Sequence, residues 1–124
     1  SLDLVEFRQE LANGSVAFLW IVVEPIKGNL TTKEFADDKI VYVLKQRFDS
    51  YNLDSLTPVT IAGNAAWKAT DTWKRTLETN TKKGDMYFFV ANGLGYSISA
   101  ESDASEWGSI EPIFSQVIQS LTLS

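Results

Sequence analysis

The chain contains no cysteine and no histidine, and these two absences exclude several classes of chemistry. Without cysteine there is no disulfide, no thiol nucleophile and no cysteine-ligated zinc site. Without histidine there is no Ser-His-Asp triad, no imidazole acid–base catalysis, and no imidazole ligand for a transition metal. An enzyme built on this sequence would have to use carboxylate, lysine, arginine or tyrosine side chains.

Long apolar segments and strongly basic segments are also missing. The longest apolar run, Val16 to Val23, has the length of a strand and is far shorter than the roughly 20 residues of a membrane-spanning helix. Lysine and arginine number 11 against 16 aspartates and glutamates, which gives a net charge of -5. Because an acidic domain repels phosphate backbones, we expect no nucleic-acid partner, and we expect no membrane span in this chain.

The residues that are present suffice for one folded domain. The 124 residues are 44% apolar and include 4 tryptophans and 7 phenylalanines. Apolar alternation and short buried runs predict strands, whereas Asn13-Gly14 and Asn92-Gly93 are hairpin turn signals and Lys83-Gly84-Asp85 suggests a further turn. The predicted strands are Leu4–Leu11, Val16–Glu24, Pro58–Ile61, Ala65–Trp73, which Thr76–Thr81 would continue, Met86–Ala91 and Tyr96–Ala100.

Two helices are predicted from capping and periodicity. Thr31-Thr32-Lys33-Glu34 is a capping box, and apolar residues at helical spacing predict a helix from about Thr32 to Tyr51. Residues from Trp107 to Leu121 show one apolar helical face that would pack on a sheet. Because hairpins dominate the order of elements, we expect an α+β fold with a mainly antiparallel sheet.

An acidic group lies between the last predicted strand and the closing helix. Asp103 and Glu106 have the spacing of a capping pair, with Ser109 as an alternative N-cap, so a structural role at the helix start explains most of this acidity. Alternatively, Glu101, Asp103 and Glu106 form a metal site, because hard cations such as calcium bind several oxygen ligands. A glycosidase-type carboxylate pair is the least favoured interpretation.

Tryptophan and basic residues on either side of a predicted hairpin form two weaker candidates. Trp67 and Trp73 lie on the same face of one strand, where they form part of the core or, less often, stack on a sugar or peptide. Lys74-Arg75 and Lys82-Lys83 form either a weak basic rim or ordinary solvated charges at a turn.

The succession of strands and turns in the C-terminal half resembles the PsbP-like family. The stretches that carry the resemblance are the strand start Gly63–Ala66, the strand Tyr96–Ala100, Pro112 to Phe114 within the last helix, and the closing Ser120-Leu121. The upstream segment from Ile21 to Tyr51 also fits. The usual N-terminal strand of the family is missing, so we expect residues 1–124 to be a single PsbP-like domain that is trimmed at its N-terminus.

The resemblance implies an α/β/α sandwich and a binding or assembly role without catalysis. Family members include the lumenal extrinsic subunit of photosystem II and many bacterial lipoproteins. It therefore implies an extracytoplasmic location (periplasmic, cell-surface or thylakoid lumenal) through a removed signal sequence, with a lipid anchor upstream. The partner is expected to be a protein, with no cofactor. The alternatives are a regulatory domain that binds calcium or manganese, and a hydrolase that uses carboxylates.

Overall fold

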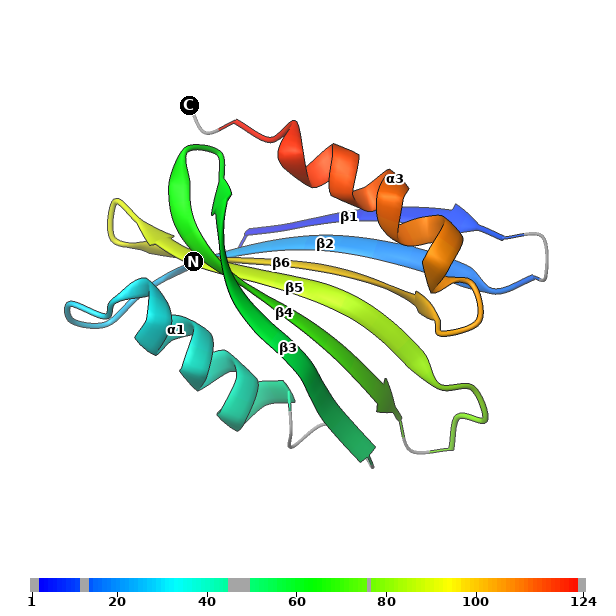
Figure 1. Cartoon of the computed structure of the whole chain (residues 1–124). Coiled ribbons are helices and arrows are strands. Elements are labelled where there is room, and N and C mark those ends of the chain that lie inside the picture. The colour runs from blue at the N-terminus through cyan, green and yellow to red at the C-terminus, as the bar shows by residue number, and fades with distance from the viewer. Residues whose placement is uncertain (1–2, 12–13, 45–49, 76, 123–124) are drawn as a thin grey trace.

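The computed structural model describes residues 3–11, 14–44, 50–75 and 77–122, with side chains for all of these except residues 3–5, 7 and 42–44. A six-stranded sheet lies between two helices (Figure 1). Its strand order is β1-β2-β6-β5-β4-β3, and every neighbouring pair is antiparallel. The elements are β1 (Asp3–Glu10), β2 (Val16–Pro25), α1 (Thr32–Asp38), the π-helical segment η1 (Lys39–Leu44), β3 (Ser50–Ile61), β4 (Asn64–Lys74), β5 (Lys82–Ala91), β6 (Leu94–Asp103) and α3 (Trp107–Gln119).

The two helices cover opposite faces of the sheet, which confirms the predicted α+β fold and the α/β/α sandwich. On the α3 side, Phe114 and Ile118 of the helix are buried with Leu19, Phe89 and Ile98 of the strands. On the α1 side, the buried cluster consists of Phe35, Ala36, Ile40, Ala69 and Phe88. Within the described part of the chain, no helix combines the length and the apolar character needed to cross a membrane.

Tight turns connect the central hairpins. Asn92 and Gly93 have φ angles of 54° and 76°, and Ala62 and Gly63 have φ angles of 50° and 78°. Positive φ at both central residues matches the right-handed twist of the strands that they join. The predicted Asn92-Gly93 turn is therefore confirmed, while Asn13 of the first predicted turn lies outside the described residues.

The first helix begins where the sequence predicts, but its predicted end at Tyr51 is wrong. The Thr31 hydroxyl accepts a hydrogen bond from the Glu34 amide at 3.1 Å, and the Glu34 carboxylate accepts one from the Thr31 amide at 3.0 Å. α1 ends at Asp38 and the π-helical segment η1 follows to Leu44, while residues 45–49 of the predicted helix lie outside the described residues. Tyr51 lies in β3 instead, because its side chain packs against the α1-side core from the sheet, and this burial outweighs the helical spacing of the apolar residues.

The predicted turn at Lys83-Gly84-Asp85 is wrong, because these residues lie inside β5. Gly84 serves close packing: a Cβ atom there would collide with the Ala100 carbonyl and approach the Trp73 ring to 3.0 Å. β3 is also longer than the predicted Pro58–Ile61, and residues 77–81 form no strand.

Neither predicted cap of the last helix forms. Glu106 occupies the N-cap position of α3 without a side-chain capping hydrogen bond. The Asp103 side chain is buried at the end of β6, and the Ser109 hydroxyl donates to the Glu106 carbonyl at 3.0 Å from within the first turn. The turn before the helix is held instead by a backbone hydrogen bond of 2.9 Å from the Glu106 amide to the Asp103 carbonyl.

Candidate functional site

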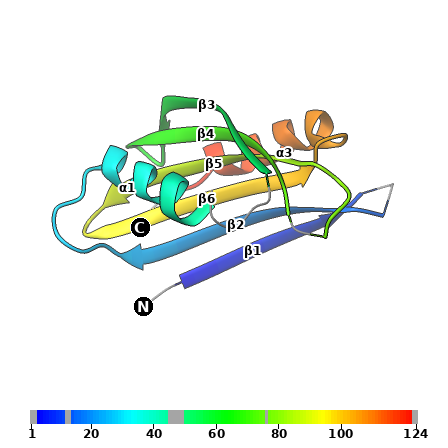
Figure 2. The same ribbon diagram turned by 90° about the horizontal axis from the view of Figure 1, so that it is seen from below.

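Among the elements that the structure describes, α1 covers its side of the sheet over only part of the width. α1 packs on β4 and β5, whereas β1 and β2 extend beyond it on the same side (Figure 2). Phe88 belongs to the α1-side core. It pairs with Ser97 of β6, and Ser97 pairs with Val22 of β2, so all three side chains point to the α1 side. Because side chains alternate along a strand, Phe18 and Trp20 of β2 also point to this side.

Two aromatic rings form the surface of this uncovered part. The Phe18 and Trp20 rings stack with centroids 5.0 Å apart and planes at 6°, and both side chains are only half-buried. The exposed Arg8 of the edge strand β1 places its guanidinium carbon 5.3 Å from the Phe18 ring centroid. We call Arg8, Phe18 and Trp20 the ring face. It offers apolar contact area and a cation–π contact, but no acid–base chemistry.

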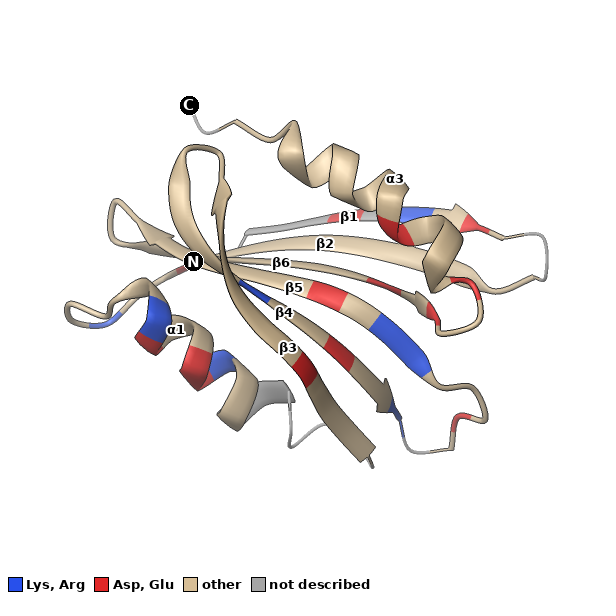
Figure 3. Ribbon diagram, in the orientation of Figure 1, with Lys and Arg blue, Asp and Glu red and all other residues tan. Residues whose placement is uncertain are grey.

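A second feature is a group of four buried carboxylates on three adjacent strands. Figure 3 shows acidic residues on β4, β5 and β6, with basic residues close by. Buried carboxylates are costly unless hydrogen bonds or cations compensate them. The group and the exposed fractions are Asp71 (1%), Asp85 (4%), Glu101 (5%) and Asp103 (4%).

Glu101 is compensated by an arginine from beyond the end of β4. The Arg75 Nη1 and Nη2 atoms lie 3.3 Å and 3.2 Å from the two Glu101 carboxylate oxygens. The guanidinium also lies 5.8 Å from the Trp73 ring centroid, and that ring lies over Gly84. The absence of a side chain at Gly84 therefore allows an aromatic ring and an ion pair to pack directly on the sheet.

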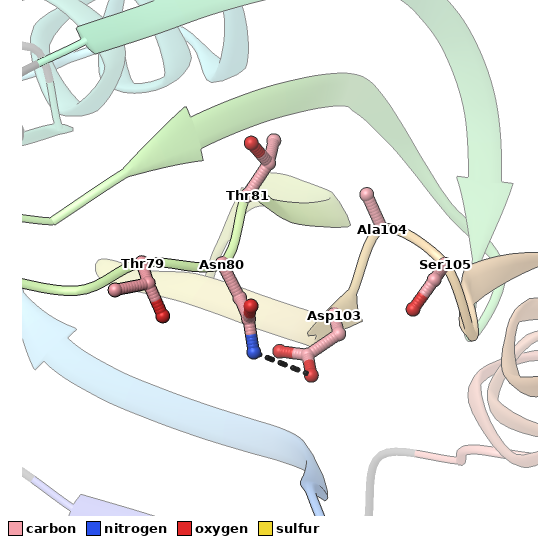
Figure 4. Close-up of a pocket in the computed structure, with 6 residues that line it drawn as sticks. All are labelled: Thr79, Asn80, Thr81, Asp103, Ala104 and Ser105. Atoms are coloured by element: carbon pink, nitrogen blue, oxygen red, sulfur yellow. Dashed lines mark hydrogen bonds between the residues drawn. The ribbon is translucent and has the colours of Figure 1, made fainter. Parts of the chain in front are cut away.

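Asp103 is compensated by its cross-strand partner. The Lys82 ammonium lies 2.5 Å from Asp103 Oδ1, and the Asn80 amide donates to Oδ2 at 3.3 Å. A pocket of about 410 Å³ opens beside this contact, as Figure 4 shows. Its lining supplies hydroxyl, amide and carboxylate groups from Thr79, Asn80, Thr81, Asp103, Ala104 and Ser105.

Asp85 lies on the opposite, α3 side of the sheet. It accepts a hydrogen bond of 2.8 Å from the Thr70 hydroxyl and lies 3.6 Å from the Lys68 ammonium, which also reaches Glu111 of α3 at 3.9 Å. Burial, followed by the charges of Asp85 and Glu111, raises the pKa of Tyr87. The contacts among Asp85, Lys68 and Glu111 connect β4, β5 and α3, so these residues have a structural role.

Asp71 differs from the other three carboxylates. The Tyr51 hydroxyl donates to Asp71 Oδ2 at 2.8 Å, whereas Oδ1 has no hydrogen-bond partner within the described part of the chain. Burial, followed by the charges of Asp85, Asp54 and Glu101, raises the pKa of Asp71 to about 7, against the lowering effect of the Tyr51 hydrogen bond. Burial and the same Asp71 charge also raise the pKa of Tyr51.

The three residues predicted as metal ligands do not share one environment. Glu101 contacts Arg75, Asp103 contacts Lys82, and Glu106 lies outside the sheet at the N-cap of α3. Among the residues that the structure describes, no three acidic side chains are grouped so that they could hold a metal ion. Metal binding at these positions stays a prediction.

Sequence reasoning missed Asp71 and Asp85 as buried charges. A signal existed for Asp71, because it alternates in phase with the apolar residues Ala69 and Trp73 of its strand. No such signal existed for Asp85, because Lys83-Gly84-Asp85 was predicted to be a turn. The hypothesis of a basic rim is also replaced in part, since Arg75 and Lys82 compensate buried carboxylates.

The chain resembles solved structures over its whole length. It matches PA94, a protein of unknown function from Pseudomonas aeruginosa described as a candidate regulator, with a TM-score of 0.85 at 16% identity, over 100% of this chain and 85% of that chain. It also matches cyanobacterial PsbP from Synechocystis with a TM-score of 0.58 at 12% identity, over 94% of this chain and 89% of that chain. No family model and no curated protein matches the sequence. These likenesses confirm the predicted resemblance at the level of the fold: the chain has the PsbP-like fold.

Proposed function

We propose that this chain is a non-catalytic binding domain that acts outside the cytoplasm through contact with another protein. The ring face is the observation that carries this proposal. Two half-buried aromatic side chains lie on the part of the sheet that α1 leaves uncovered, beside β1, which is an edge strand of the described sheet. Aromatic residues next to arginine are typical of the centre of protein interfaces.

The charges around the ring face define the partner. Glu6 and Glu10 are exposed on the same face of β1 as Arg8, and the whole chain has a net charge of -5. The partner that fits is an extended polypeptide segment whose apolar side chains are flanked by lysine or arginine. Such a segment would place its apolar side chains on Phe18 and Trp20, and its backbone could add a strand to β1.

Other observations support the proposed non-catalytic role and the proposed extracytoplasmic location. The buried carboxylates are engaged with cations and hydroxyl groups, and the composition excludes histidine and cysteine chemistry. The extracytoplasmic location and an upstream lipid anchor follow from the family resemblance, whose members include a lumenal photosystem II subunit and bacterial lipoproteins. A reading frame with a signal peptide that ends in a lipid-modifiable cysteine upstream of Ser1 would support the location, and one without an export signal would contradict it.

The binding proposal is tested with a defined peptide and backbone NMR. We expect a peptide of alternating leucine and lysine residues to shift amide resonances mainly in β1, β2 and β6. The double variant Phe18→Ala/Trp20→Ala should weaken binding by at least about tenfold, because it removes the central aromatic contacts. The matched control is Ile113→Ala/Val117→Ala, which removes two exposed apolar side chains on the outer face of α3 and should leave the affinity unchanged. Equal binding of a peptide with glutamate in place of lysine, or shifts that centre elsewhere, would contradict the proposal.

A further inference from the structure

The contact between Tyr51 and Asp71 joins the edge of the sheet to its interior. In the described sheet β3 is an edge strand that pairs with β4, and Tyr51 and Leu53 face Trp73 and Asp71 across that pair. The Tyr51 hydroxyl donates to Asp71 at 2.8 Å, and this carboxyl group is buried with one oxygen unpartnered within the described residues. A partly buried hydrogen bond between the two strands therefore involves a group that can gain or lose a proton.

An irregularity divides β3 next to this contact. The register of the β3–β4 pair shifts between Leu53 and Ser55, so that Asp54 forms a bulge. Ser50–Leu53 precedes the bulge and Ser55–Ile61 follows it. Because bulges interrupt pairing and bend an edge strand, the first segment can separate from β4 while the second stays paired.

We propose that the Tyr51–Asp71 hydrogen bond is a proton-controlled latch that holds the first segment of the edge strand, Ser50–Leu53, against β4. The bulge at Asp54 is its hinge. When the latch opens, Tyr51 and Leu53 leave the α1-side core and the buried end of β4, with Asp71 and Trp73, becomes accessible. This proposal does not depend on the ring face, which lies at the other edge of the sheet.

The charges around Asp71 determine the direction of the pH response. Tyr51 of β3 contacts it, the charges of Asp85, Asp54 and Glu101 act on it from β5, β3 and β6, and the Arg75 guanidinium is engaged with Glu101. Burial and the three carboxylates favour the neutral form of Asp71 in the closed latch, where the pKa is about 7. In the open segment the carboxyl group is solvated, and its pKa returns to about 4.

Opening therefore releases a proton between about pH 4 and about pH 7. The closed form binds the proton more tightly, so the latch is firmest in acid and weakens as the pH rises through this range, with no further change above it. One proton per opening corresponds to at most about a tenfold change in the opening constant for each pH unit. Between pH 5 and pH 7 the two pKa values give an increase of roughly fifty-fold.

Hydrogen exchange with peptide-level mass spectrometry tests the latch on the whole chain, with exchange times scaled for the intrinsic pH dependence. We expect protection of Ser50–Leu53 to fall by roughly fifty-fold from pH 5 to pH 7, while Ser55–Ile61 serves as the internal control and changes little. In Asp71→Asn, which cannot titrate, protection of Ser50–Leu53 should be the same at both pH values. In Tyr51→Phe, which removes the donor, protection of Ser50–Leu53 should be lower than in the wild-type chain at both pH values.

Two results would overturn the latch. One is a change of less than about threefold in wild-type Ser50–Leu53 between the two pH values, which would mean that no proton is linked to opening. The other is an equal change in Ser55–Ile61, which would mean that the sheet responds as a whole. Because both results are read from the wild-type chain, they decide the proposal even if a variant fails to fold.

Discussion

Replacing Arg75 by methionine is the sharpest test of how the buried carboxylates are tolerated. The Arg75 guanidinium contacts both oxygens of Glu101, whose side chain is only 7% exposed. Methionine keeps most of the apolar stem but removes the charge and the two hydrogen bonds. The variant therefore leaves a buried carboxylate in the sheet without the cation that contacts both of its oxygens.

The expected loss follows from the burial of Glu101. Removing one partner of a buried ion pair costs about 3 to 5 kcal/mol, because the remaining charge has no compensation. We therefore expect Arg75→Met to lower the free energy of unfolding at pH 7 by about 3 to 5 kcal/mol.

The variant also loses the contact between Arg75 and the Trp73 ring, which adds up to about 1 kcal/mol to the expected loss.

Urea unfolding at pH 7, followed by tryptophan fluorescence, measures the effect. The matched control is Lys74→Met, an exposed neighbour at the end of β4, which should change stability by less than about 0.5 kcal/mol. Adding Glu101→Gln to Arg75→Met should restore most of the loss. A loss of less than about 1 kcal/mol, or no recovery in the double variant, would refute the reasoning.

Three further outcomes are expected. Gly84→Ala should lower stability by about 3 kcal/mol or prevent folding, because its Cβ meets the backbone of β6, and a thermal melt would show this. Thr31→Ala should cost about 1 kcal/mol through the lost capping box, while Thr31→Ser keeps the wild-type melting temperature. Calorimetric titration with millimolar calcium or manganese should release no heat, because Glu101 and Asp103 already contact cationic side chains; heat that disappears in Asp103→Asn would support a metal site instead.

Local signals predicted much of the fold. The capping box marked the start of α1, the Asn92-Gly93 pair marked the hairpin between β5 and β6, and alternation marked β1 and β4. Each of these signals depends on residues within a few positions of one another, where backbone preferences and side-chain hydrogen bonds act directly. Features of this kind can be inferred without knowledge of the tertiary structure.

The candidate site depends on contacts that the sequence does not reveal. Arg75 meets Glu101 across 26 positions of the chain, and Lys82 meets Asp103 across 21. Their pairing requires the register of β4, β5 and β6, and that register also requires Gly84 to lie inside a strand. Because glycine is more often a turn signal, the sequence pointed to a break in the strand that brings these groups together.

The buried carboxylates differ in the group that compensates their charge, and this difference follows their position in the sheet. Glu101 and Asp103 lie on β6 in the interior of the sheet and each contacts a cation. Asp71 lies beside the edge strand with the bulge, and its partner among the described residues is the Tyr51 hydroxyl. A buried carboxyl group without a cation lowers the stability of the fold. Asp71 lies beside an edge strand, and the sheet can open there with the loss of few backbone hydrogen bonds. At the opposite edge, the half-buried rings of Phe18 and Trp20 remain available to a partner. One face of one sheet thus combines a rigid, ion-paired centre with one edge suited to binding and another suited to a response to protons.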